Sequence, residues 1–201
     1  MTIKKAIIYK IFTKMPLIET ERLILRKMRA DDAADMFEYA ARKDVTEYLT
    51  WYPHPDKAYT RDYLEYLGTK YRTGDFFDWA ITLKKENGKM IGTCGFTSFD
   101  FANDGAEVGY VLNPEYRGQG LVPEALLAVL EFGFNNLLLH RAEAKYIVGN
   151  DASRRVMEKV GMKFEGIKRE GMLIKGNFRD IGVCSILKDE FYETYEKQST
   201  T

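Results

Sequence analysis

The segment Glu107–Leu127, EVGYVLNPEYRGQGLVPEALL, constrains the fold most, because it predicts a strand, a glycine-rich turn and a helix in immediate succession. Residues Val108–Leu112 predict the strand, and Asn113-Pro114 provides the turn signal that ends it. Leu121–Asn136 then carries apolar residues at helical spacing. Pro123 fits only in the first turn of such a helix, so it fixes where the helix begins.

The turn itself, Arg117-Gly118-Gln119-Gly120, places two glycines where a ligand can approach the backbone without interference from a Cβ atom. Free N–H groups and the dipole at the start of the next helix favour phosphate oxygens. Neither the nucleoside-triphosphate pattern GxxxxGK[ST] nor the dinucleotide pattern GxGxxG matches these residues. The turn therefore predicts a phosphate-binding loop of another class, with a purely structural turn as the alternative.

A second motif lies downstream, where the sequence YIVGNDASRRVMEKVG starts at Tyr146. The stretch His140–Val148 predicts a strand, and Asn150 is suited to cap a helix over Asp151–Lys159. Ser153 falls in the first turn of that helix. Taken by itself, this motif is explained by an N-cap and a first-turn serine.

Together the two motifs resemble the GNAT superfamily of N-acetyltransferases, whose acyl-CoA pyrophosphate loop has the pattern [Gln/Arg]-x-x-Gly-x-[Gly/Ala]. Arg117 matches the first place and Gly120 the fourth, and Val122 stands at the sixth, where the branch that acetylates protein N-termini often has a larger residue. The resemblance covers roughly Pro16 to Glu193 and is greatest to ribosomal-protein-alanine acetyltransferases. The other stretches that contribute are LIETERL at 17–23, EVGY at 107–110 and GNFRD at 176–180.

The resemblance implies an α+β, layered fold with a mixed, mostly antiparallel twisted sheet, flanking helices and a splay between the central strands. It implies acetyl-CoA as cosubstrate, with Asn150 bonding the pantetheine arm, Ser153 donating to the leaving thiolate and the N–H of Val111 polarising the thioester carbonyl. The residues assigned to the cofactor in this way are Val111, Leu112, Arg117, Gly118, Gln119, Gly120, Leu121, Val122, Asn150 and Ser153.

A general base for the acceptor amine is sought among the carboxylates. Glu107 is the first candidate, because period-two alternation places it on the side of Gly109 and opposite Val108. A structural salt bridge is the alternative interpretation of Glu107. Glu170 is a second candidate, expected to point the same way along its strand as Met172, and solvent water is a third.

The acceptor region, residues 29–77, is expected to select the amine. Candidate acceptor-pocket residues are Trp51, Tyr52, Phe77 and Tyr110. A place in the core is the alternative for such aromatic residues, except in the Trp51–Pro55 loop, whose two aromatic residues and two prolines are hard to bury entirely. The resemblance favours a protein N-terminal α-amine of the ribosomal-protein type. Alternatives are a polyamine, amino acid or aminoglycoside acceptor, or a CoA-binding module without catalysis. A polycation would favour converging acidic residues, and those available are Asp44, Glu47, Asp56, Asp62, Glu65, Asp75 and Asp78.

Length and composition predict one domain at 15–193, between an N-terminal extension, 1–14, and a C-terminal tail, 194–201. Thirty basic and thirty acidic side chains cancel, so we expect neither a nucleic-acid nor a membrane partner. Without a signal-peptide or transmembrane pattern, the chain is predicted to be cytoplasmic. The oligomeric state stays open, a homodimer included.

The cysteines Cys94 and Cys184 are predicted to be buried free thiols. The histidines His54 and His140 lack ligand-spaced partners, so no metal site is predicted. Hydrophobic periodicity and turn residues predict strands at 22–28, 77–84, 90–99, 106–112, 140–148, 163–170 and 179–188, and helices at about 31–42, 58–72, 121–136 and 151–159.

Overall fold

The computed structural model describes residues 3–199, and the chain forms two compact units. Unit 1 contains the residues up to Gly95 together with Tyr110–Val129, and unit 2 contains Phe96–Gly109 and the residues from Leu130 onward. Each unit therefore combines segments that are far apart in the sequence. Strands β4 (Met90–Asp100) and β5 (Gly105–Leu112) and helix α5 (Leu121–Asn136) contribute residues to both.

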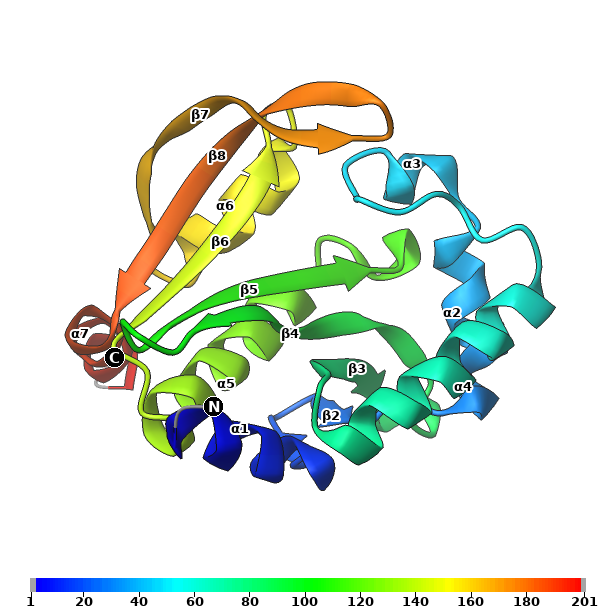
Figure 1. The fold of residues 1–201 in the computed structure, drawn as a ribbon, viewed down its shortest axis with the longest axis horizontal. Helices are drawn as coiled ribbons and strands as arrows, with labels where there is room; N and C mark the ends of the chain where they lie inside the picture. The colour runs from blue at the N-terminus through cyan, green and yellow to red at the C-terminus, as the bar shows by residue number, and fades with distance from the viewer. Residues whose placement is uncertain (1–2, 200–201) are drawn as a thin grey trace. The chain divides into compact units, whose positions relative to one another are not determined.

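Unit 1 is built on an antiparallel sheet in which β2 pairs with both β1 and β3, and β4 follows β3 in the strand order. Its helices include the 17-residue α4, which supports the prediction at 58–72 (Figure 1). The elements are β1 (Ile18–Glu19), β2 (Leu23–Arg26), β3 (Phe77–Leu83), α1 (Ile3–Thr13), α2 (Ala33–Ala40), α3 (Lys43–Thr46), α4 (Lys57–Thr73), and the short 3-10 helices η1 (Ala30–Asp32), η2 (Lys84–Glu86) and η3 (Pro114–Tyr116).

Helix α4 has clear start and stop signals. The side chain of Asp56 accepts a hydrogen bond from the Tyr59 N–H at 2.8 Å, which satisfies one of the free donors of the first turn. Gly74 ends the helix in the left-handed conformation, with φ 70°. Leu64 and Leu67 lie on the buried face of the helix. The local sequence therefore determines where this helix begins and ends.

Helix α1 is part of the core of unit 1. Phe12 is fully buried, and its ring meets those of Phe77 and Trp79 edge-to-face at centroid distances of 5.0 and 5.3 Å. The Tyr9 hydroxyl donates to Asp75 at 3.0 Å. The predicted boundary at residue 15 thus does not separate this helix from the core, and residues 1–2 of the predicted extension lie outside the described residues.

Unit 2 contains a mixed sheet in the order β5-β6-β8-β7. Strands β5 and β6 (Arg141–Ile147) are parallel, from Gly105 opposite Arg141 to Val108 opposite Ala144. Strand β8 (Asn177–Leu187) runs antiparallel to both β6 and β7 (Lys163–Ile174). The mixed, mostly antiparallel sheet predicted from the sequence is therefore confirmed. The predicted splay involves Tyr110–Leu112 of unit 1 and the end of β6 in unit 2, and it stays a prediction.

The end of the chain differs from the sequence-based expectation. The hairpin of β7 and β8 extends past the predicted ends at 170 and 179 to a turn at Lys175-Gly176, where both residues have positive φ (50° and 81°). Residues 188–199 form helix α7 (Lys188–Ser199), which directly follows β8. The preceding helix in the chain is α6 (Asp151–Lys159). The predicted tail thus belongs to a helix as far as Ser199, and residues 200–201 lie outside the described residues.

Candidate functional site

The turn after β5 is anchored by Asn113, which is buried. Its backbone N–H donates to the Ile91 carbonyl at 2.7 Å, and its side-chain oxygen accepts from the Glu115 N–H at 3.2 Å. Beside this turn, a Cβ atom on Gly92 would lie 2.2 Å from the Val111 carbonyl oxygen, so the glycine allows β5 to approach β4 closely. The backbone leaving Leu112 is therefore held in place before the glycine-rich turn begins.

The predicted phosphate loop has the conformation that its glycines suggest. Gly118 and Gly120 are both left-handed, with φ 78° and 74°. Arg117, Gly118 and Gln119 are exposed, whereas the Leu121 side chain is buried where α5 begins. The N–H groups of a first helical turn have no acceptor within the helix. An exposed loop with two glycines at a helix N-terminus fits a pyrophosphate group, because the glycines leave room for its oxygens to approach the backbone donors.

The contacts of Thr20 and Arg22 with Glu124, next to the loop, were not predicted from the sequence. Glu124, in the first turn of α5, accepts hydrogen bonds from the Thr20 hydroxyl at 2.5 Å and from the Arg22 backbone N–H at 2.9 Å. The Arg22 guanidinium forms an ion pair with the same carboxylate, with Nε 2.6 Å from Oε2, and its Nη1 donates to the Gln119 carbonyl at 2.9 Å. Burial opposes ionisation of Glu124, but the hydrogen bonds from Thr20 and Arg22 outweigh it and lower the pKa of the carboxyl.

The second motif lies in unit 2, where Asn150 is the N-cap of α6. Its side-chain oxygen accepts from the Ser153 backbone N–H at 3.2 Å, while its amide nitrogen makes no hydrogen bond to any described residue. Ser153 itself is half-buried. The cap therefore orients the Asn150 amide and leaves an amide N–H donor for a ligand. That unit 1 and unit 2 residues serve one cofactor stays a prediction.

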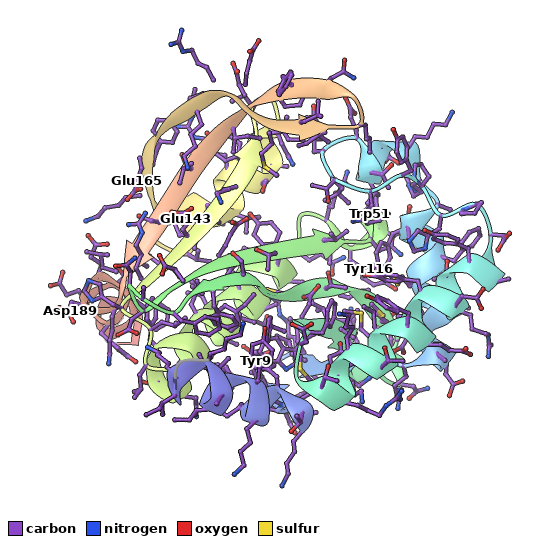
Figure 2. All side chains as sticks on the ribbon, viewed as in Figure 1. Tyr9, Trp51, Tyr116, Glu143, Glu165 and Asp189 are labelled. Carbon is purple, nitrogen blue, oxygen red and sulfur yellow. The ribbon has the colours of Figure 1, made fainter. Side chains whose placement is uncertain are left out.

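Glu107 occupies the face that alternation predicts, because Ala106 and Val108 are buried and Glu107 is not. Its carboxylate forms an ion pair with Lys145 at 2.5 Å. Burial lowers the pKa of Lys145, but the hydrogen bond to Glu107 and the charge of Glu107 outweigh it, so the pKa is raised. Glu143, labelled in Figure 2, lies directly opposite Glu107 in the parallel pair and is 3.5 Å from Lys145. The salt-bridge alternative for Glu107 is thus present in the structure.

The regular alternation expected around Glu170 is interrupted by a bulge, and a role of Glu170 as the base stays a prediction. The register between β7 and β8 shifts between Lys168 and Met172, and Glu170 has φ 50°. The bulge breaks the alternation that would have pointed Glu170 the same way as Met172. The Glu170 N–H donates to the Asp180 carboxylate at 2.7 Å, so the Asp180 side chain stabilises the bulge.

The four candidate acceptor residues are in different environments. Phe77 contacts the rings of Tyr9 and Phe12, which supports its alternative role in the core. Tyr52 is 67% exposed on the loop before α4, and Trp51 on the same loop, labelled in Figure 2, lies 5.3 Å from the His54 ring. Tyr110 is half-buried. The loop residues therefore stay candidates for contact with an acceptor.

Cys94 and Cys184 are buried free thiols, as predicted. Within residues 3–199, the His, Cys, Asp and Glu side chains do not gather into groups of three or more that could hold a metal ion. Over the same residues, every helix is too short or too polar to cross a lipid bilayer.

Asp78, on β3, is an unusual member of the acidic set. Its Oδ1 atom is buried, as is the Tyr39 hydroxyl, and neither atom has a hydrogen-bond partner among the described residues. Burial raises the pKa of Asp78 from 3.8 to about 7, although hydrogen bonds from Thr93 and the Trp79 backbone oppose the rise. The folded protein therefore retains this proton at pH values where the unfolded chain releases it.

We expect Asp78→Asn to stabilise the protein at high pH. The contribution of Asp78 to the stability of the wild type falls as pH rises from 3.8 to about 7, because the unfolded Asp78 ionises first, and asparagine removes this loss. Urea unfolding should show the variant gaining on the order of 2 kcal/mol relative to wild type between pH 5 and pH 8.

Asp75→Asn is the matched control, because hydrogen bonds from Lys70 and Tyr9 lower the pKa of Asp75 despite some desolvation. Its stability deficit should appear above the unfolded pKa and vanish as pH falls. A pH-independent difference for Asp78→Asn would contradict burial of its ionised form.

Residues 22–163 match the model of the acetyltransferase (GNAT) domain. The chain is 34% identical over 177 residues to the uncharacterized N-acetyltransferase p20 of Bacillus licheniformis, covering 88% of this chain and 99% of that protein. It is 25% identical to the [ribosomal protein uS5]-alanine N-acetyltransferase of Escherichia coli, covering 81% and 86%. The solved structure of a GNAT-family acetyltransferase from Bacillus anthracis superposes with TM-score 0.76 at 30% identity, covering 87% and 99%. The chain belongs to the GNAT family of N-acetyltransferases.

Proposed function

We propose that this N-acetyltransferase transfers the acetyl group of acetyl-CoA to the N-terminal α-amine of a protein, of the ribosomal-protein type. The observation that carries the cofactor assignment is the exposed loop with left-handed Gly118 and Gly120 at the start of α5. The acceptor class is supported by similarity to the uS5-alanine N-acetyltransferase of Escherichia coli. Acetyl-CoA is the cosubstrate that the family uses.

In this proposal the backbone from Gly118 to Val122 donates to the pyrophosphate, and the Asn150 amide donates to a carbonyl of the pantetheine arm. The Val111 N–H polarises the thioester carbonyl, and Ser153 donates to the sulfur as negative charge develops there. The amine attacks the carbonyl carbon, the C–S bond breaks, and the amine loses one proton to a base. Each role requires only a donor or an acceptor at a fixed position.

The base need not be strong for this acceptor. An α-amine has a pKa of about 7.7–8.0, so a sizeable fraction is neutral at physiological pH, whereas a lysine side chain near 10.4 is mostly charged. We propose Glu107 as the base, with Glu170 or water as the alternatives. Because Glu107 forms an ion pair with Lys145, a structural role can be tested by removing either partner of the pair.

A polycationic acceptor receives less support, because several acidic side chains of the acceptor region are already engaged. Asp44 forms an ion pair with Arg42 at 3.0 Å, and Asp75 forms one with Lys70 at 3.2 Å. Asp56 caps α4, and the Asp78 Oδ1 is buried. A polyamine or aminoglycoside would need carboxylates that are free to face it.

The test is mass spectrometry of acetyl-CoA reactions against a panel of N-terminal peptides, polyamines, amino acids and aminoglycosides. We expect a mass gain of one acetyl group on the α-amine of a subset of peptides, with peptides blocked at the N-terminus as the negative control. Acetylation confined to polyamines or aminoglycosides would overturn the acceptor assignment. Absence of any acetylation, with CoA binding intact, would favour a binding module.

The pyrophosphate assignment predicts that Gly118→Val weakens CoA binding by about 10–100-fold, because a side chain would cover the backbone donors. Gly88→Val is a matched control, since Gly88 has the same φ of 78° and, like Gly118, open space where a Cβ atom would lie. Both variants should lose about 1–2 kcal/mol of stability through left-handed strain. Calorimetric titration with CoA should separate them, and equal affinities would refute the loop assignment.

The role of Glu107 is tested by breaking the same ion pair from each side. Glu107→Gln should lower kcat by roughly 10²–10⁴-fold near neutral pH if its carboxylate takes the proton. Lys145→Gln removes the ion pair but keeps the carboxylate, so we expect it to retain most activity. If both variants lose stability and activity in parallel, Glu107 is structural and the base is Glu170 or water.

A further inference from the structure

The loop at 117–120 is hydrogen-bonded to the segment before β2 through the side chain of Arg22. Arg22 lies just before β2, and its guanidinium reaches both the Gln119 carbonyl and the Glu124 carboxylate. We propose that Arg22 is a positioning residue for the pyrophosphate of CoA, because it orients the Gln119–Gly120 peptide so that the Gly120 N–H faces the ligand. The inference rests on the proposed function and extends it to residues behind the loop, which we call the Arg22 clamp: Thr20, Arg22, Gln119 and Glu124.

The orientation follows from peptide geometry. In a planar trans peptide the C=O and the next N–H point in opposite directions, and the described residues contain no cis peptide bond. Because Arg22 Nη1 donates to the Gln119 carbonyl at 2.9 Å, the Gly120 N–H points away from the arginine. Glycines flank Gln119 on both sides, so this peptide would otherwise rotate easily. The arginine removes that freedom before a ligand binds.

Glu124 explains why an arginine is needed. A carboxylate in a first helical turn interacts favourably with the helix dipole, but it would repel a bound diphosphate. Arg22 balances this charge in direct contact, and the Glu124 side chain is only 17% exposed. In return Glu124 fixes the guanidinium. The carboxylate is itself held in place by hydrogen bonds from the Thr20 hydroxyl and the Arg22 backbone N–H. The clamp is therefore close to neutral overall while it holds the loop.

The position of Arg22 also bears on Gly120. A Cβ atom on Gly120 would lie 3.7 Å from Arg22 Nη2, and this nitrogen makes no hydrogen bond to a described residue.

Lysine cannot replace the arginine, because a single ammonium lacks the planar fork that reaches a carbonyl and a carboxylate at once. The clamp is thus specific for arginine and is distinct from the exposed Arg117 in the loop itself.

The experiment compares CoA with a cosubstrate that has no pyrophosphate. We expect Arg22→Lys to raise the Kd of CoA and the KM of acetyl-CoA by about 10–100-fold. With acetyl-pantetheine as acetyl donor, kcat/KM of the variant should stay within about twofold of wild type, because this donor does not use the loop.

The matched control is Arg141→Lys, which breaks the bidentate pair of Arg141 with Glu165 within unit 2. This control should leave the ratio of acetyl-CoA to acetyl-pantetheine activity unchanged. Equal losses with both donors in Arg22→Lys would show a merely structural arginine, and an unchanged CoA affinity in a folded variant would also overturn the inference. Wild-type protein that fails to bind CoA would instead overturn the proposed function.

Discussion

Burial of helix α5 is the constraint on which the site depends. Leu121, Ala125, Leu126 and Val129 are all buried along its first turns. Leu121 is both the first residue of the helix and a buried side chain, so burial of the apolar face fixes the orientation of the helix from its first residue. The chain must therefore turn from the end of β5 into α5 within a few residues, and left-handed glycines provide that turn. The core therefore fixes the N–H donors of the first helical turn, whereas the loop peptide before it depends on Arg22.

The sequence predicts best where glycine, proline and capping residues act locally. The helix over 121–136 and the left-handed loop glycines follow from Pro123, Gly118 and Gly120, because these residues restrict or permit backbone angles directly. The cap by Asn150 was predicted for the same reason. In each case the physical cause lies within a few residues of the element it determines.

Long-range packing explains what the sequence did not predict. Helix α1 depends on the contacts of Phe12 with Phe77 and Trp79, more than 60 positions away. Helix α7 likewise brings Phe191 against Phe134, at 5.2 Å between ring centroids. The contact of Arg22 with Glu124 also joins residues that are 102 positions apart. A single sequence contains the charges of such pairs, but not the register that brings them together.

In the proposed reaction, acceptor selectivity depends on positions other than the base. If a partly neutral α-amine needs little base catalysis, the surface that orients the amine decides which acceptor reacts. The loop that presents Tyr52 is well suited to this role because His54 anchors it. The backbone N–H of His54 donates to the Ala40 carbonyl at 3.0 Å, and the ring Nδ1 of His54 lies 2.9 Å from the Thr60 hydroxyl. Since that hydroxyl donates to the Asp56 carbonyl, Nδ1 is the donor to Thr60, and burial lowers the pKa of His54 and keeps the ring neutral. An exposed aromatic ring on a rigid loop can distinguish acceptors by shape at little entropic cost.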